Sequence, residues 1–381
     1  MRIAHVVGTR TPANIQETER HVVYLAGAQR ARGMDAAVVT SKHGLLFNLG
    51  EEDGIPAFVV DDLLPNGEAV PGSGISAQGI VAMLKDLSPE IIHCHDLSMT
   101  QAVVTAASII GVPCAVTLQE GETGRLIHEI IAAKRAGRKF TITIITASKR
   151  EFEVLQEDGM AGIDFHYVPY GTRTRCAAHQ QELGTSCSPN LVTASNLEFV
   201  KGIDLAILAM VELRRRRGPD CPVLNIYGAG DPGENLLEKV FGDLSEYLIE
   251  MAKVLRLYDV VKFHGIQADI LDKCPSSDVL IVPSRLETGP LVVLEAMSRG
   301  MPIVACNVGQ VAEMLPDRRY GRIVPVNSIT ALADAVNSML TDIASGQFDP
   351  DLLVERHQSQ YSIEKMADRI ATVYQSAMVA G

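Results

Sequence analysis

The sequence lacks the long apolar segments and the positive charge that mark membrane-spanning and nucleic-acid-binding proteins. None of its apolar runs approaches the roughly 20 residues that a helix needs to cross a bilayer. The net charge is −12, which argues against a nucleic-acid partner. The segment Met1–Gly8 is too short and too strand-like for a signal peptide, so we expect a cytoplasmic protein.

Cysteine is present, but not in a pattern that builds a small cross-linked fold. The seven cysteines are scattered and odd in number, and none forms a Cys-x-x-Cys pair. We therefore expect reduced thiols rather than a disulfide framework or a cysteine metal site. The 381 residues, of which 47% are hydrophobic, suffice for two domains with full cores.

Short apolar strands alternate with helix-length segments along the chain, a pattern typical of an α/β protein with parallel sheets. A first series of expected strands is Ile3–Gly8, Ala36–Thr40, Ala57–Val60, Ile91–His95, Cys114–Leu118, Thr141–Thr146 and His166–Pro169. A second series is Leu191–Ala194, Val223–Tyr227, Val261–His264, Val279–Pro283 and Ile303–Ala305. The polar segment Gly171–Asn190 between the two series is interpreted as a linker, which predicts domains at 1–175 and 176–359.

The segment Pro283–Met297 is the most informative about function. It runs from the end of an expected buried strand through Gly289 and Pro290 into a helix. Proline suits the first position of a helix, and the amides that follow, from Leu291 onward, have no acceptor within the helix. These amides and the helix dipole predict a binding site for an anion such as phosphate.

Two glutamates flank this expected anion site. Glu287 comes just before the helix, and Glu295 lies over a turn inside it. A carboxylate repels an anion, so both glutamates are expected to accept hydrogen bonds from hydroxyl groups. A phosphate flanked by two polyols describes a nucleotide sugar.

The same segment resembles the Glu-x7-Glu signature of retaining glycosyltransferases of the family 4 type. The run Arg299–Ala305, followed by Gly309 and Glu313, extends the match. The resemblance implies the GT-B fold, in which two Rossmann-like domains with parallel sheets face an interdomain cleft. It also implies that a terminal helix, about 360–381, packs back on the first domain. Ligands of such sheets bind at the carboxyl ends of the strands.

The resemblance assigns further residues of the second domain to the donor. Lys201 precedes a glycine at a helix start, where a lysine and free amides suit a diphosphate leaving group. Asn196 stands near the position where most relatives carry an arginine, and Arg285 is a candidate for the missing charge. Gly228 matches a turn near the nucleotide, and Ile266 belongs to the segment beside the nucleobase.

The first domain resembles the family more loosely. His93 and His95 lie on one face of an expected strand, and we interpret one as packed in the core and His95 as lining the cleft. Gln119 occupies the position of a sugar-contacting histidine in many relatives; it can hydrogen-bond but cannot titrate. Glu120 and Glu122 follow, either as contacts to the acceptor or as solvated loop residues.

The resemblance, together with these residues, implies a retaining glycosyltransferase that moves a sugar from a nucleotide-sugar donor to a hydroxyl of a glycan, a lipid-linked or a small-molecule acceptor. A UDP-sugar is expected ahead of a GDP-sugar, with no cofactor and no metal. The alternatives are a degenerate protein that binds nucleotide or a partner without transfer, a nucleotide-sugar epimerase, or a phosphorylase whose pyridoxal phosphate lysine cannot be placed. Basic residues between 125 and 139 allow membrane contact, although a solvated helix is the preferred interpretation there.

Overall fold

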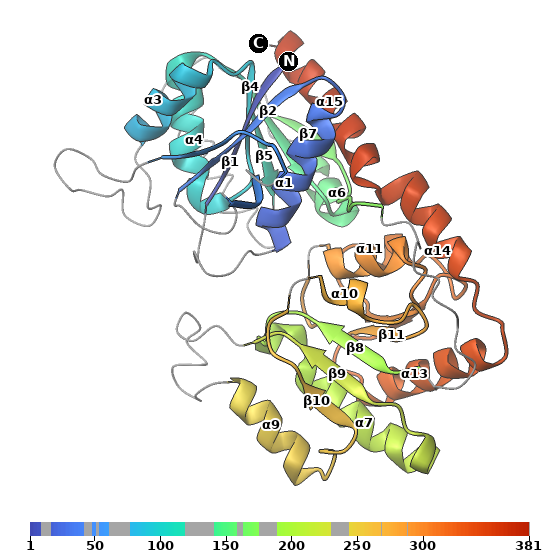
Figure 1. Ribbon diagram of the computed structural model, residues 1–381. Coiled ribbons are helices and arrows are strands. Elements are labelled where there is room, and N and C mark those ends of the chain that lie inside the picture. The colour runs from blue at the N-terminus through green and yellow to red at the C-terminus, as the bar shows by residue number, and fades with distance from the viewer. Residues whose placement is uncertain are drawn as a thin grey trace. The chain divides into compact units, whose positions relative to one another are not determined.

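Figure 1 shows a computed structural model of the chain. It describes residues 1–8, 17–41, 48–50, 53–60, 77–118, 141–157, 163–174, 189–229, 244–267, 269–287 and 289–380. The chain divides into two compact units, one formed by Met1–Arg173 with Tyr361–Gly381 and the other by Thr174–Gln360. Each unit has its own parallel sheet, which confirms the α/β class and the two Rossmann-like folds predicted from the sequence.

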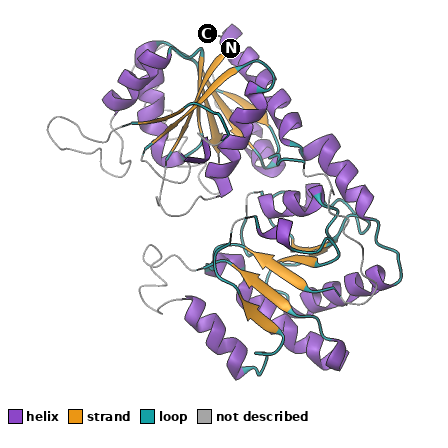
Figure 2. Cartoon of the chain, in the orientation of Figure 1, coloured by secondary structure: helices purple, strands orange, loops and turns teal. Residues whose placement is uncertain are grey.

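The first unit is built on a parallel sheet in the order β3-β2-β1-β4-β5-β6-β7. Its strands are β1 (Arg2–Val7), β2 (Asp35–Thr40), β3 (Ala57–Val59), β4 (Ile91–Cys94), β5 (Cys114–Leu118), β6 (Ile142–Thr146) and β7 (Asp164–Tyr167). Every residue of β4, β5 and β6 is buried. Figure 2 shows helices on both faces of the sheet, which explains why these strands are apolar throughout rather than alternating.

The helices of the first unit include a segment from the far end of the chain. They are α1 (Glu17–Arg30), α3 (Ala77–Leu87), α4 (Leu97–Ile110), α6 (Lys149–Glu157) and α15 (Ile363–Ala380). A backbone hydrogen bond holds the start of α15 against the segment after β7, since the Ile363 amide donates to the Thr172 carbonyl at 2.8 Å. Its buried face packs against α1 and the β5–β6 region, and Tyr374 is fully buried there. No helix in the described ranges is long and apolar enough to traverse a bilayer.

The second unit repeats the strand order of the first. Its sheet runs β10-β9-β8-β11-β12-β13, with the strands β8 (Leu191–Ala194), β9 (Leu224–Tyr227), β10 (Val261–Phe263), β11 (Val279–Val282), β12 (Ile303–Cys306) and β13 (Arg322–Val324). Among the described strands of this unit, β13 is the one that was not predicted from the sequence. It is a three-residue edge strand that begins with an arginine and is half-buried for most of its length, so it has no apolar run to identify it.

The helices of the second unit surround this sheet. They are α7 (Ile203–Arg217), α9 (Leu244–Val254), α10 (Ile270–Lys273), α11 (Leu291–Ser298), α12 (Val311–Met314), α13 (Ile329–Ala344) and α14 (Pro350–Arg356). Pro290 was predicted to occupy the first helical position of α11, but it is the N-cap, because its ψ of 103° is extended and the helix begins at Leu291. In both sheets the strand order reverses direction between the first and fourth strands, β1/β4 and β8/β11, where open α/β sheets bind ligands.

Candidate functional site

Lys201 lies at the reversal point of the second sheet, in the turn that connects β8 to α7. A short 3-10 helix, Phe199–Lys201, ends at Gly202, whose φ of 67° is left-handed. A Cβ atom on Gly202 would lie 2.1 Å from the carbonyl oxygen of Pro283, at the end of β11. Glycine is therefore required here both for the backbone conformation and because two loops approach closely. This contact brings the turn after β8 against the loop after β11.

Lys201 and Glu287 meet across these two loops. The Lys201 Nζ lies 2.8 Å from the Glu287 Oε1, and the Ser284 hydroxyl donates to the same oxygen at 2.9 Å. The side chains of Lys201 and Glu287 are 21% and 14% exposed. A partly desolvated ammonium can bind a phosphate strongly, and a partly desolvated carboxylate can accept from hydroxyl groups. The structure thus brings together two residues that are 86 positions apart and that were both predicted for the site.

Arg285 is held by protein groups beside this pair. Its Nη1 and Nη2 donate to the two carboxylate oxygens of Asp204 at 2.8 and 2.7 Å, and its Nε donates to Asn327 Oδ1 at 2.9 Å. Nη1 also donates to the Phe199 carbonyl at 2.7 Å. The Asp204 carboxylate raises the pKa of Arg285 above its ordinary value. The guanidinium that was predicted to replace a missing charge therefore already has a carboxylate partner.

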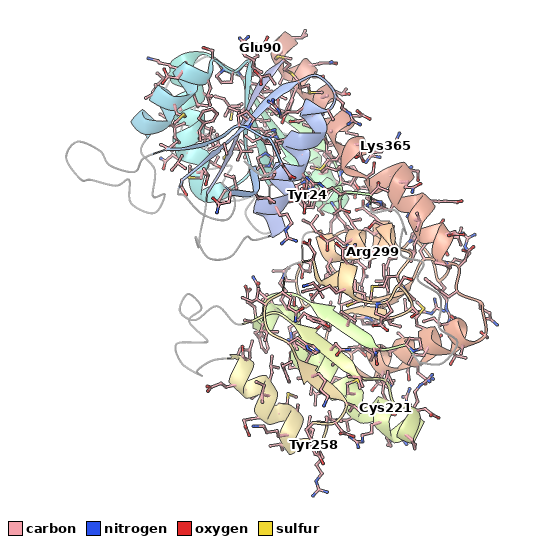
Figure 3. The ribbon with its side chains drawn as sticks, viewed as in Figure 1. Tyr24, Glu90, Cys221, Tyr258, Arg299 and Lys365 are labelled. Atoms are coloured by element: carbon pink, nitrogen blue, oxygen red, sulfur yellow. The ribbon has the colours of Figure 1, made fainter. Side chains whose placement is uncertain are left out.

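Glu295 is the outward-facing position of α11. Every other residue of Leu291–Ser298 is buried, whereas Glu295 is only partly buried. The backbone at Glu295 is fixed from the far end of the helix, since Arg299, labelled in Figure 3, donates from Nη1 to the Glu295 carbonyl at 2.7 Å. At the near end, the Val293 amide donates to the Pro290 carbonyl at 3.0 Å, so the amides before it belong to the helix terminus. Gly289 and Leu291 flank Pro290 at this terminus.

Three further predicted residues lie at the carboxyl ends of β8, β9 and β10. A Cβ on Gly228 would lie 1.8 Å from the Ser195 carbonyl oxygen, so only glycine fits beside the loop that carries Asn196. The Gly228 amide donates to the Gly265 carbonyl at 2.9 Å, next to Ile266, whose side chain is 62% exposed. These contacts join the loops after three adjacent strands, with Asn196 and Ile266 at their surface.

In the first unit, the reversal point carries a buried histidine cluster. His5 on β1 pairs in register with His93 on β4, and His95 follows β4. His5 Nδ1 lies 2.9 Å from His95 Nε2, and the rings of His93 and His95 are 3.8 Å apart. His95 was predicted to line a cleft, but its side chain is only 3% exposed, because the His5 and His93 rings pack against it.

The cluster is anchored by polar side chains from other elements. His5 Nε2 lies 2.7 Å from Gln29 Oε1 on α1, and His93 bonds Tyr374 of α15 at 2.6 Å and Thr117 of β5 at 2.7 Å. Burial lowers the pKa of His5 to about 4 and that of His93 and His95 well below the usual histidine value, so the rings are neutral at pH 7.

The histidine cluster is the one group of potential metal ligands that the described residues bring within 4.8 Å. A metal lies in the plane of each imidazole that binds it, whereas the His93 and His95 rings are tilted by only 35° and partly stacked. Both ring nitrogens of His5 and His93, and Nε2 of His95, also bond to protein partners. We therefore interpret the cluster as a hydrogen-bond network of the core.

Sequence reasoning identified His93 and His95 but not His5, because their pairing depends on the order of strands in the sheet. It also did not identify Ser284 or Asp204 as partners of site residues; Pro-Ser before Glu287 was the available signal for Ser284. Gln119, Glu120 and Glu122 lie outside the described residues, although Gln119 comes directly after β5, which ends at Leu118.

The two units match two family models. Residues 17–171 match the model described as a glycosyl transferase 4-like domain, and residues 178–347 match that of the glycosyl transferases group 1. A glycogen synthase of Mycobacterium tuberculosis is 25% identical over 417 aligned residues, which cover 99% of this chain and 95% of the relative. The alpha-D-kanosaminyltransferase of Streptomyces kanamyceticus is 26% identical over 254 residues, covering 64% of this chain and 62% of the relative.

Solved structures show the same architecture over the whole chain. A glycosyltransferase from Rickettsia africae has a TM-score of 0.77 at 14% identity, covering 100% of this chain and 99% of the other. HepE of Anabaena, in complex with UDP, has a TM-score of 0.76 at 18% identity, covering 99% of this chain and 100% of the other. At these identities the likeness establishes the fold.

Proposed function

Because the chain is a glycosyltransferase of the GT-B fold, we propose that it transfers a sugar from a nucleotide-sugar donor to an acceptor hydroxyl with retention of anomeric configuration. Its glycosyl transferase 4-like domain comes first, and the glycosyl transferases group 1 domain follows. The observation that carries this proposal is the Lys201–Glu287 pair at the reversal point of the second sheet, beside the amino terminus of α11. This site offers one cation, helix amides and carboxylates, as a diphosphate linked to a sugar requires.

In the proposed reaction, the protein contributes position and charge. The bond between the anomeric carbon and the diphosphate oxygen breaks, and the acceptor oxygen forms its bond to the same face of that carbon. The acceptor's proton passes to the departing diphosphate. Lys201 and the amides of α11 stabilise the charge that develops on this leaving group. Glu287 orients hydroxyl groups of the donor sugar, and the partly exposed Glu295 accepts from the ribose.

The nucleotide is proposed to extend along the loops after β8, β9 and β10. Asn196, Gly228 and the backbone at Ile266 line this path, and the glycine at 228 lets the loops lie close together. A UDP-sugar is favoured as the donor, with support from the UDP bound to the structural neighbour HepE. No metal is proposed, because the charge of Lys201 and the helix amides can replace that of a metal at the diphosphate.

The ion pair between Arg285 and Asp204 supports a second function, in which the site binds a nucleotide without transferring sugar. Asn196 carries no charge, and the guanidinium of Arg285 is bound to Asp204, so the leaving diphosphate would rely on Lys201 and the helix amides. A site with weakened charge stabilisation would suit a degenerate protein that binds a nucleotide without transferring sugar. An epimerase, which needs no acceptor, would also use such a site.

A panel of nucleotide sugars, tested with and without acceptors, separates these functions. The donors are UDP-, GDP- and ADP-sugars, and the acceptors include glycogen and D-inositol 3-phosphate, which the names of relatives suggest. Transfer predicts nucleotide release that depends on an acceptor and yields a new glycoside. Conversion of donor alone to its epimer would establish the epimerase, and nucleotide binding without any turnover would establish the degenerate protein.

A further inference from the structure

We propose that Arg285 and Asp204 form a positioning pair that holds Glu287 and Lys201 in register for transfer, rather than a ligand for the diphosphate. This inference rests on the proposed function, since it concerns the same site. Arg285 lies two residues before Glu287, and Asp204 lies three residues after Lys201. The pair therefore joins the segment after β11, which contains Glu287, to the start of α7, which follows Lys201.

Arg285 binds the Lys201 turn by both its backbone and its side chain. Its amide donates to the Val200 carbonyl at 2.7 Å, and its Nη1 donates to the Phe199 carbonyl at 2.7 Å. Its guanidinium carbon lies 4.1 Å from the centre of the Phe199 ring. The 3-10 turn that ends at Lys201 is thus fixed at two successive carbonyls by one residue of the Glu287 loop.

Asp204 fixes the other side of the same turn. It lies in the first turn of α7, where a carboxylate is favoured by the helix dipole. Both of its oxygens accept from Arg285, a bidentate geometry that restricts rotation as well as distance. The side chains of Arg285 and Asp204 are only 16% and 19% exposed, so solvent competes weakly for the pair.

The alternative role, in which Arg285 binds the diphosphate, conflicts with these contacts. Its guanidinium would have to leave both oxygens of Asp204, the amide oxygen of Asn327 and the Phe199 carbonyl. Asp204 would then keep a largely buried carboxylate without its bidentate partner, which is unfavourable. The geometry therefore favours a residue that acts through Lys201 and Glu287.

A double-mutant cycle tests the pair. Asp204→Asn, Arg285→Gln and the double variant are compared with wild type for kcat and for the donor KM. If the pair positions the site, each single change lowers kcat by about 10–100-fold, as small displacements of reacting groups do, with the donor KM changed by less than about threefold. Because both changes remove the same interaction, the double variant should be no slower than the slower single variant.

Arg214→Gln is the matched control, because Arg214 forms a bidentate pair with Asp259 near the other end of α7. It should leave kcat unchanged. Thermal unfolding identifies folded variants, and Arg285→Lys replaces Arg285→Gln if the latter does not fold; since it keeps the charge without the fork, it should restore kcat only in part.

A diphosphate ligand gives a different pattern, which would overturn the positioning role. Arg285→Gln would then raise the donor KM, while Asp204→Asn, which frees the guanidinium, would keep or increase activity. Additive losses in the cycle would overturn it as well. A wild type that turns over no nucleotide sugar with any acceptor would instead refute the proposed function first, and the positioning role with it.

Discussion

The two units share a strand order but carry opposite chemistry at the reversal point of their sheets. In the second unit, β8 and β11 lead to the charged groups Lys201 and Glu287, which remain partly exposed. In the first unit, β1 and β4 carry the neutral histidines His5 and His93, which are fully buried. The same topology therefore supports an accessible ionic site in one unit and a closed hydrogen-bond network in the other.

The difference follows from where the side chains lie along the strands. The site residues of the second unit come after the strands, in loops and at helix ends, where side chains can remain accessible. His5 and His93 lie within strands covered by helices, so desolvation keeps them neutral. Placement beyond a strand thus favours an accessible charged group, but packing matters as well, since His95 follows β4 and is buried by the His5 and His93 rings.

The largest expected effect is a loss of folding stability in acid that is greater in the first unit than in the second. Burial lowers the pKa of both His5 and His21 from 6.5 to about 4, so the unfolded chain binds protons more readily than the folded one. The stability that these two neutral histidines contribute is fully present above pH 6.5 and is lost as the pH falls toward about 4. The loss reaches about 3 kcal/mol at pH 4 for His5 alone. Hydrogen exchange measured at several pH values should show α1, β1 and β4 losing protection.

Two variants sharpen this acid prediction. His5→Gln removes one of the titrating rings, and the acid transition of the first unit should then move to lower pH if the variant folds. His264→Gln, which changes an exposed histidine of the second unit, should leave the transition in place. The second unit also has a buried histidine, His357, whose pKa falls to about 4, so it should lose some stability over the same range. The loss should be larger in the first unit, where burial lowers the pKa of His5, His21, His93 and His95. The carboxylates Glu212 and Asp317 in the second unit have pKa values lowered to about 2 by arginine partners, so their own contributions are lost only at lower pH. Simultaneous loss of both units at pH 6 would contradict the comparison.

Lys201→Ala gives the next largest effect, and we expect it to lower turnover far more than stability. Removing a charge-assisted contact to the leaving group costs about 2–4 kcal/mol of transition-state stabilisation, or roughly 30- to 900-fold in kcat. Stability should fall much less than turnover, because the partly buried Glu287 carboxylate loses one partner but keeps the Ser284 hydroxyl as donor. Lys253→Ala, which breaks a lysine–glutamate pair on α9, is the control. Wild-type turnover in Lys201→Ala would remove this residue from the site.

Gln119→Ala tests whether the first unit also contributes a contact to the donor sugar, from a residue directly after β5. If Gln119 hydrogen-bonds the donor sugar, its loss leaves a buried polar partner unmet and costs about 1–3 kcal/mol. Gln119→His should keep or raise activity, and the wild-type pH–rate profile should lack an ionisation near pH 6.5 from this position, about the usual value of histidine. An alanine variant with normal steady-state kinetics would transfer the role to Glu120 or Glu122.

Chelation is expected to have no effect. Lys201 and the amides of α11 are proposed to supply the charge that a metal would otherwise place at the diphosphate. Turnover measured before and after EDTA treatment should be equal. Loss of activity that Mg²⁺ or Mn²⁺ restores would show that the ionic site of the second unit is insufficient alone.

The sequence predicted local structure well where a single segment determines it. The observed β8, Leu191–Ala194, has the predicted bounds, and α11 begins at Leu291, one residue after the predicted start at Pro290. Lys201 and Glu287 were both identified, since each stands in its own local pattern.

The partnerships between distant segments were not predictable in the same way. The bond of Arg285 to Asp204 and the pairing of His5 with His93 depend on which strands are neighbours, and nothing in either local segment specifies this. The interpretation of Arg285 as a candidate for the missing charge rested on its position alone. Its carboxylate partner lies 81 residues earlier in the chain.

The stereochemistry of transfer tests the central claim most directly. Wild-type protein is incubated with an α-linked UDP-sugar and the acceptor that the panel identifies, and the anomeric coupling constant of the new glycosidic linkage is measured by proton NMR. Front-face transfer at the Lys201–Glu287 site predicts an α-linked product. A β-linked product would contradict the proposed retaining mechanism and the roles assigned to these two residues.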